Sequence, residues 1–150
     1  MHKKESPMHK VIGGCHCGNI SYVAGISNEP SMYKPRACDC NFCTSHGAAY
    51  ISDKNGSLKI TVKNQSELSR YKQGSRIAEF LICKNCGILI GVCYEENGCI
   101  YGSINFRSLG AGYDFGLIET ISPEQLNDEI RIDRWKNIWY SNVSIEHENS

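Results

Sequence analysis

Seven of the nine cysteines of this 150-residue chain fall into three short clusters, and these clusters restrict the fold more than any other sequence feature. The clusters are Cys15 and Cys17 in "GGCHCGN", Cys38, Cys40 and Cys43 in "CDCNFC", and Cys83 and Cys86 in "CKNCG". An odd number of cysteines cannot all pair internally, and nine in 150 residues is below the density of disulfide scaffolds. In a reducing compartment such spacing is typical of metal binding or catalysis rather than of disulfides.

Zinc prefers four ligands at tetrahedral corners, and a structural site usually takes two from each of two loops. The simplest partition of the cysteines is therefore four plus three. The first and third clusters, Cys15, Cys17, Cys83 and Cys86, would close a structural site. The second cluster, Cys38, Cys40 and Cys43, would hold a zinc ion whose fourth position stays open, as in catalytic sites. We therefore expect two zinc ions per chain, with the second cluster as the catalytic group.

Two other interpretations of these cysteines remain open at this stage. The second cluster could be closed by His46, Cys93, Cys99 or His16, which would give two structural zinc ions and no chemistry. The other interpretation is a redox role for the C-x-x-C pair. The sequence lacks the βαβ pattern that surrounds such a pair in thioredoxin-like proteins. Cys93 lies in an apolar run and is expected in the core, whereas Cys99 lies at a hairpin edge without an evident partner.

The first two-thirds of the sequence predict short β-strands separated by turns. Six runs rich in Ile, Val, Tyr and Phe have strand composition: 19–25, 48–52, 57–63, 76–83, 88–94 and 99–106. Asn-Gly pairs in "SDKNGS" and "EENG" favour tight hairpins between them. No long amphipathic helix separates the runs, so we predict a mainly antiparallel β protein.

The C-terminal segment predicts one short helix, or two, between Pro123 and Tyr140. Ser122 is the expected N-cap, with Gln125 three residues later completing a capping box. One helical face would carry Ile130, Ile132, Trp135, Ile138 and Trp139. The aromatic residues Trp135, Trp139 and Tyr140 could cover the core or form a homodimer contact, and core is the commoner use.

Charge and hydropathy narrow the classes of partner and location. Lysine plus arginine equals aspartate plus glutamate, which argues against a nucleic-acid-binding surface. The first residues lack the apolar region of a signal peptide, and no apolar run approaches the roughly 18 residues of a membrane span. We therefore expect a cytoplasmic protein with no membrane partner. Residues 1–10 are expected to be a flexible tail and residues 11–150 a single zinc-binding domain.

Three segments together resemble the family of glutathione-dependent formaldehyde-activating enzymes, which includes relatives of centromere protein V. They are "GGCHCGNISY", "ACDCNFCTSHGAAYIS" and "FLICKNCG", and the order of all seven clustered cysteines agrees. The short run "GSINF", which ends near Asn105, fits the family as well. The resemblance covers roughly residues 13–109, and the three-part pattern is far more specific than any single C-x-x-C.

The resemblance implies a fold and an activity. The family fold is the β-tent, in which several curled antiparallel sheets meet around zinc. The implied activity is that of a carbon–sulfur lyase, which joins glutathione to formaldehyde as S-hydroxymethylglutathione or reverses that step. A zinc-bound thiol loses its proton and becomes a nucleophile, which suits a small thiol and a small aldehyde as substrates. The alternative is a non-catalytic two-zinc binding module, as in the chromatin-associated relatives.

The sequence departs from the family pattern after the second cluster. Many relatives carry an arginine immediately after its third cysteine, whereas this chain has Thr44. The exchange removes a positive charge that could hold a substrate carboxylate, which puts glutathione itself in doubt. His46, three residues after Cys43, is either a proton donor or an exposed turn residue.

Overall fold

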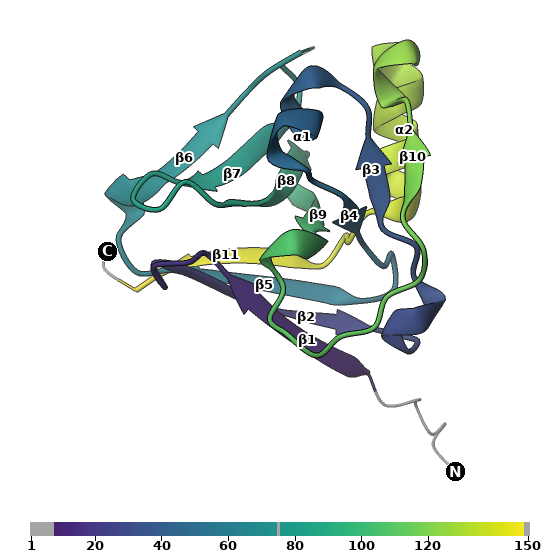
Figure 1. Ribbon diagram of the computed structural model, residues 1–150. Coiled ribbons are helices and arrows are strands. Elements are labelled where there is room, and N and C mark those ends of the chain that lie inside the picture. The colour runs from purple at the N-terminus through teal and green to yellow at the C-terminus, as the bar shows by residue number, and fades with distance from the viewer. Residues whose placement is uncertain (1–7, 75, 149–150) are drawn as a thin grey trace.

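The computed structural model describes residues 8–74 and 76–148, and it is mainly β (Figure 1). A four-stranded sheet has the spatial order β1 (His9–Gly14), β2 (Ile20–Ile26), β5 (Ser57–Val62) and β11 (Val143–His147). A seven-stranded sheet has the order β10 (Glu119–Ile121), β3 (Arg36–Cys38), β4 (Tyr50–Ile51), β9 (Cys99–Asn105), β8 (Leu89–Glu96), β7 (Glu79–Cys83) and β6 (Leu68–Tyr71). The helices are α1 (Asn41–His46) and α2 (Asp128–Ile138), with short 3₁₀ turns at η1 (Pro30–Met32), η2 (Gln65–Glu67), η3 (Phe106–Ser108) and η4 (Pro123–Gln125).

The elements enclose a triangle in the view of Figure 1. The four-stranded sheet forms its base, β6 and β7 form one side, and β3, β10 and α2 form the other. The predicted fold class is therefore confirmed: curled sheets meet around the cysteine clusters, and one short helix lies near the C-terminus. The helices in the described part of the chain are all too short or too polar to cross a lipid bilayer.

Most strand pairs are antiparallel, as predicted, but two pairs at the sheet edges are parallel. β10 runs parallel to β3, and β11 runs parallel to β5. In each pair a short segment of the C-terminal third returns to a strand from the first half of the chain. Both sheets are therefore mixed rather than purely antiparallel.

The core follows the two-residue period of the strands. In β5, Leu58, Ile60 and Val62 are buried, while Lys59 between them is exposed. Across the sheet, Ile60 lies opposite Tyr22 of β2, which is also buried. This alternation places one face of the four-stranded sheet against the inside of the triangle.

All six predicted strand segments are present, with shifted ends in several cases. β1 begins at His9, two residues before the expected start of the domain, and residues 1–7 of the expected tail lie outside the described residues. Five strands, β1, β3, β6, β10 and β11, were not among the predicted segments. These strands are short or polar, and pairing with a neighbouring strand rather than their own composition makes them strands.

The predicted C-terminal helix is present, but its predicted cap is wrong. Ser122 makes no side-chain cap, because its hydroxyl instead donates to Oδ2 of Asp39 at 2.5 Å. The cap of α2 is Asn127, whose side chain accepts from the Ile130 amide at 2.9 Å. Asp128 and Glu129 follow in the first turn, where the helix dipole favours negative charge.

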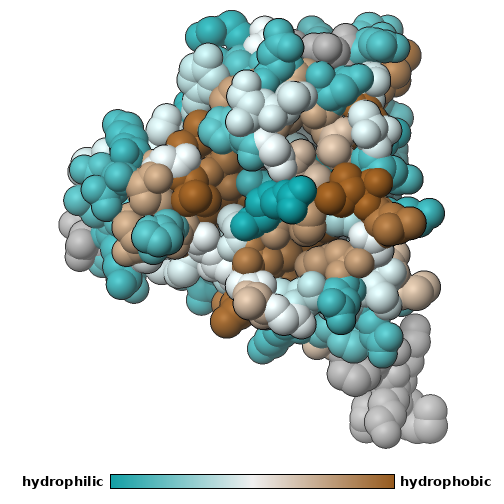
Figure 2. Space-filling model, viewed as in Figure 1, coloured by the Kyte–Doolittle hydropathy of each residue, from teal (hydrophilic) through white to brown (hydrophobic). Residues whose placement is uncertain are grey.

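The expected apolar face of the helix is only partly correct. Trp135 and Trp139 are buried, and Tyr140 just beyond the helix is fully buried, so these aromatic residues belong to the core. Ile130 is exposed. On the surface shown in Figure 2, hydrophobic side chains gather across the middle of the face, between hydrophilic margins.

Candidate metal centres

The first and third cysteine clusters meet in space. Cys15 and Cys17 lie in the turn between β1 and β2, while Cys83 ends β7 and Cys86 lies in the turn that follows it. The Sγ atom of Cys17 lies 3.6 Å from that of Cys15 and 3.6 Å from that of Cys83, and all four sulfur atoms lie within 4.8 Å of one another. Four sulfurs bound to zinc at about 2.3 Å are about 3.8 Å apart, so these four residues fit a tetrahedral site.

The turn around Cys83 and Cys86 has the geometry of a zinc knuckle. The amide of Gly87 donates to the Cys83 carbonyl at 2.8 Å, and the Cys83 amide donates to the Ile88 carbonyl at 3.0 Å. Gly87 has φ of 82°, a conformation that favours glycine. The tight turn aims both thiol groups inward, as the C-x-x-C-G pattern predicts.

In this first site, hydrogen-bond donors favour the thiolate form of Cys17, whereas burial disfavours it at Cys83. A hydrogen bond from the Asn85 side chain, followed by one from the Asn19 amide, lowers the pKa of Cys17 to about 6. Burial raises the pKa of Cys83 to about 12. The donor set and its spacing are those of a closed four-cysteine site that ties the four-stranded sheet to the seven-stranded one.

The second cluster is built around the start of helix α1. Cys38 ends β3, and Cys40 is the N-cap of α1, with its Sγ accepting from the Cys43 amide at 3.4 Å. Cys43 is thereby turned back toward Cys38 and Cys40. Gly47 ends the helix with φ of 60°. The sulfur atoms of the three cysteines lie within 4.8 Å of one another, so the sequence-predicted group does converge.

Among the described residues, no histidine, carboxylate or further cysteine joins the three thiol groups of this cluster. His46 has an exposed side chain, and its ring packs on Phe42 with 4.7 Å between centroids. Cys93 is buried in the hydrophobic core, as expected, and Cys99 donates to the Ser141 carbonyl at 3.6 Å. His16 lies in the turn of the first cluster and is exposed.

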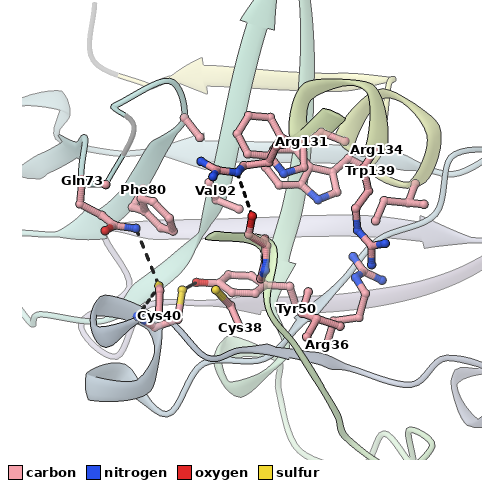
Figure 3. A pocket seen from close by; sticks show the side chains of 17 residues that line it. Arg36, Cys38, Cys40, Tyr50, Gln73, Phe80, Val92, Arg131, Arg134 and Trp139 are labelled. Atoms are coloured by element: carbon pink, nitrogen blue, oxygen red, sulfur yellow. Dashed lines mark hydrogen bonds between the residues drawn. The ribbon is translucent and has the colours of Figure 1, made fainter. Parts of the chain in front are cut away.

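Two polar side chains contact the second cluster and were not predicted. The Tyr50 hydroxyl lies 3.2 Å from Sγ of Cys43, and Nε2 of Gln73 lies 3.9 Å from Sγ of Cys40 (Figure 3). A hydrogen bond from the Cys43 thiol lowers the pKa of Cys38 to about 6, and the same bond, with burial, raises the pKa of Cys43. Burial also raises the pKa of Tyr50, which therefore keeps its proton as a donor.

The three cysteines open onto a cavity of about 270 Å³, which we call the cysteine pocket (Figure 3). Its apolar wall includes Phe80 of β7, Val92 of β8, Trp135 of α2, and Trp139 directly after that helix. The two indole rings stack with 4.7 Å between centroids and 13° between planes. The first cysteine group lines no part of this cavity.

Three arginines also line the cysteine pocket: Arg36 of β3, and Arg131 and Arg134 of α2. Burial, followed by the charge of Arg134, lowers the pKa of Arg36 to about 10. Thr44, which follows Cys43, is exposed and does not line the pocket. The positive charge at this pocket therefore comes from arginines of β3 and α2. These arginines could not be predicted from the sequence, because no local motif links β3 to a helix almost a hundred residues later.

Comparison with known proteins adds information about the fold. No protein-family model matches the chain, and no curated protein matches it. A crystal structure of a Rhodobacter sphaeroides protein is similar, with a TM-score of 0.54 and 24% sequence identity. The match covers 73% of this chain and 99% of that chain. At this identity the likeness supports the architecture alone.

Proposed function

We propose that this chain is a zinc-dependent enzyme of the glutathione-dependent formaldehyde-activating type, which adds a thiol to a small aldehyde or reverses that step. The observation that carries the proposal is the second cluster. Three convergent thiol groups, without a fourth ligand among the described residues, face a cavity large enough for small substrates. The group formed by the first and third clusters, by contrast, has four thiol groups, a ligand set that suits a closed structural site.

The reaction balances without an oxidant or a reductant. A carbon–sulfur bond forms between the thiol and the aldehyde carbon, the C=O π bond opens, and the thiol proton ends on the new hydroxyl group. Zinc held by Cys38, Cys40 and Cys43 would favour the thiolate form of a substrate thiol. Three thiolates leave such a site with one negative formal charge, so thiol activation suits it better than water activation.

The side chains of the pocket serve this chemistry by orientation and by exclusion of water. The Tyr50 hydroxyl holds the Cys43 sulfur in place, and the Cys43 amide does the same for Cys40. Phe80, Trp135 and Trp139 give the cavity an apolar wall against which two small reactants can be held close together. Proximity of this kind replaces a bimolecular encounter with a reaction between bound groups.

Cobalt substitution tests the proposal most directly, because thiolate charge-transfer bands report a new sulfur ligand. We expect 2-mercaptoethanol, a small neutral thiol, to change the spectrum of the wild-type protein and to release a proton on binding. Cys43→Ser should abolish the change. Cys99→Ser is the matched control, since this cysteine lies outside both groups, and it should respond like the wild type.

Turnover is measured separately with carbon-13 formaldehyde by NMR exchange spectroscopy. We expect faster hemithioacetal exchange with the wild type than with Cys43→Ser, at matched thiol concentration and pH because the uncatalysed addition is quick. A cobalt spectrum that responds to no thiol, together with unchanged exchange, would favour the two-zinc binding module.

A further inference from the structure

We propose that Arg36 and Arg134 form an anion subsite in the cysteine pocket, and that it binds the carboxylate of a ligand whose apolar part packs on Trp135 and Trp139. That this ligand is the thiol or aldehyde substrate rests on the proposed function. The binding of a carboxylate does not.

The two arginines reach the pocket from opposite elements. Arg36 comes from β3 and Arg134 from α2, and Figure 3 shows their guanidinium groups turned toward each other at one side of the cavity. Gln73 lies on the opposite side. Cys38 lies between these two sides, so a ligand held at the arginines extends toward the cysteines.

Arg36 is held in place by neutral partners. Its Nη2 donates to the Ser52 hydroxyl at 2.8 Å, and the Ser103 hydroxyl lies 3.4 Å from the same atom. Both serines are buried, so they fix the direction of the guanidinium group. Glu119 is opposite Arg36 in the β3–β10 register, but it is exposed and forms no ion pair with Arg36.

Arg134 likewise forms no ion pair with any described residue, and none of the described residues that line the pocket is acidic. Two like charges that face each other beside an apolar wall repel, and an anion between them removes that repulsion. Guanidinium groups match the planar shape of a carboxylate and can bind it with paired hydrogen bonds. The pair therefore has the composition of a carboxylate site that no side chain of the described residues fills.

Arg131 serves a different purpose, although it lines the same pocket. Its Nε donates to the Pro123 carbonyl at 3.1 Å, its Nη2 donates to the Leu126 carbonyl at 2.8 Å, and its Nη1 lies 3.6 Å from Oδ1 of Asp128. These bonds fasten η4 to α2. Arg131 is thus a structural residue at the wall of the pocket.

Charge counting supports a monoanionic ligand. A divalent zinc ion with three thiolates has a net formal charge of −1, whereas Arg36 and Arg134 together contribute +2. One positive charge then remains for a ligand. The stacked rings of Trp135 and Trp139 beside it offer an apolar surface for the rest of that ligand.

Tryptophan fluorescence tests the subsite without any turnover. The chain has two tryptophans, and both line the pocket, so their emission reports on this cavity alone. We expect saturable quenching or enhancement by 3-phenylpropanoate. We expect about tenfold weaker binding of the uncharged 3-phenylpropanamide, since hydrogen bonds to a charged group are the stronger ones.

The variant Arg134→Gln should weaken 3-phenylpropanoate binding about tenfold and leave amide binding unchanged. Because Arg134 is exposed and bonds to no described residue, this substitution does not threaten the fold. Lys136→Gln is the control, since it removes the same charge from the same helix outside the pocket, together with the ion pair to Glu96, and it should bind like the wild type. Equal affinity for acid and amide, or an unchanged Arg134→Gln, would overturn the subsite.

A second measurement separates this proposal from the proposed function. The cobalt-substituted protein is titrated with 3-mercaptopropanoate and with neutral 3-mercaptopropanamide. If both thiols alter the spectrum and the acid does so at about tenfold lower concentration, both proposals stand. If phenylpropanoate binds but no thiol alters the spectrum, the subsite stands and the proposed function fails. If both thiols act at equal concentration, the subsite is wrong and the proposed function stands.

Discussion

The Tyr50 hydroxyl and the Cys43 Sγ lie 3.2 Å apart, and both residues are buried. Tyr50 belongs to β4, in the middle of the seven-stranded sheet, and Cys43 belongs to α1. This contact couples the helix that carries Cys43 to an interior strand of the seven-stranded sheet. It also gives a buried sulfur a hydrogen-bond donor, which a thiolate requires.

Tyr50→Phe should therefore weaken metal binding at the second cluster and lower the free energy of unfolding of the metal-loaded protein by about 1–3 kcal/mol, because the metal-bound Cys43 thiolate would lose a buried hydrogen bond. Chelator competition and urea unfolding measure the two effects. Tyr71→Phe is the control, since Tyr71 is about half exposed and its ring contact with Phe42 survives the change. Equal metal affinity in wild type and Tyr50→Phe would contradict the assigned role.

Protein purified without a chelator should contain two zinc ions per chain, one for each cysteine group. Cys43→Ser should reduce the content toward one. Elemental analysis, combined with the protein concentration, gives the number of zinc ions per chain. A reproducible value of one in the wild type, with the second group metal-free, would refute the four-plus-three partition.

The two cysteine groups should contribute differently to the stability of the fold. Cys83→Ser removes a ligand that joins the two sheets, and structural zinc contributes of order 10 kcal/mol to folding, so this variant should unfold or aggregate. Cys43→Ser should remain folded, because α1 and its neighbours pack through other contacts as well. Thermal melts compare the variants, with Cys99→Ser as the control. If Cys83→Ser and Cys43→Ser lose stability equally, both sites are structural.

The Asp53 carboxylate should make the stability of the fold depend on pH. Burial raises its pKa, but hydrogen bonds from the Tyr33 hydroxyl, from the Ser27 amide and hydroxyl, and from the Asn55 amide outweigh burial, so the pKa is lowered overall. A lowered folded-state pKa stabilises the protein above the unfolded-state value of about 3.9, and that stability is lost as pH falls through the folded-state value.

Asp53→Asn should lower the free energy of unfolding by about 1–3 kcal/mol at neutral pH, and the difference from wild type should shrink below about pH 4. Urea unfolding at several pH values measures it. Metal loss at low pH acts on both proteins, so it cancels in the comparison. A difference that does not change with pH would contradict the role of the Asp53 charge.

The sequence predicted what depends on local spacing. The C-x-C and C-x-x-C patterns identified the three clusters, because ligands two or three residues apart in tight turns must point the same way, and the preference of zinc for four ligands then joined the first cluster to the third. The long strands were found because their alternation reflects burial on one face. The position of Gly87 in the knuckle follows from the same local geometry.

The sequence could not predict what depends on contacts between distant segments. β10 and β11 become strands only by pairing with β3 and β5, more than eighty residues earlier in the chain. Arg36 and Arg134 line one pocket only because β3 and α2, almost a hundred residues apart in the sequence, lie beside the same cavity. The predicted capping box at Ser122 is wrong for the same reason. The Ser122 hydroxyl donates to Asp39, which lies 83 residues earlier in the sequence.

The separation of the ligands along the chain sets an order for biosynthesis. Cys38, Cys40 and Cys43 leave the ribosome almost together, next to the short helix that orients them. Cys17 must wait for Cys83, which lies 66 residues later, or several seconds at a synthesis rate of about 5–20 residues per second. If both groups hold zinc, the site that joins the two sheets is therefore the later of the two to assemble on the growing chain, and until then its first two thiols lack two of their four partners.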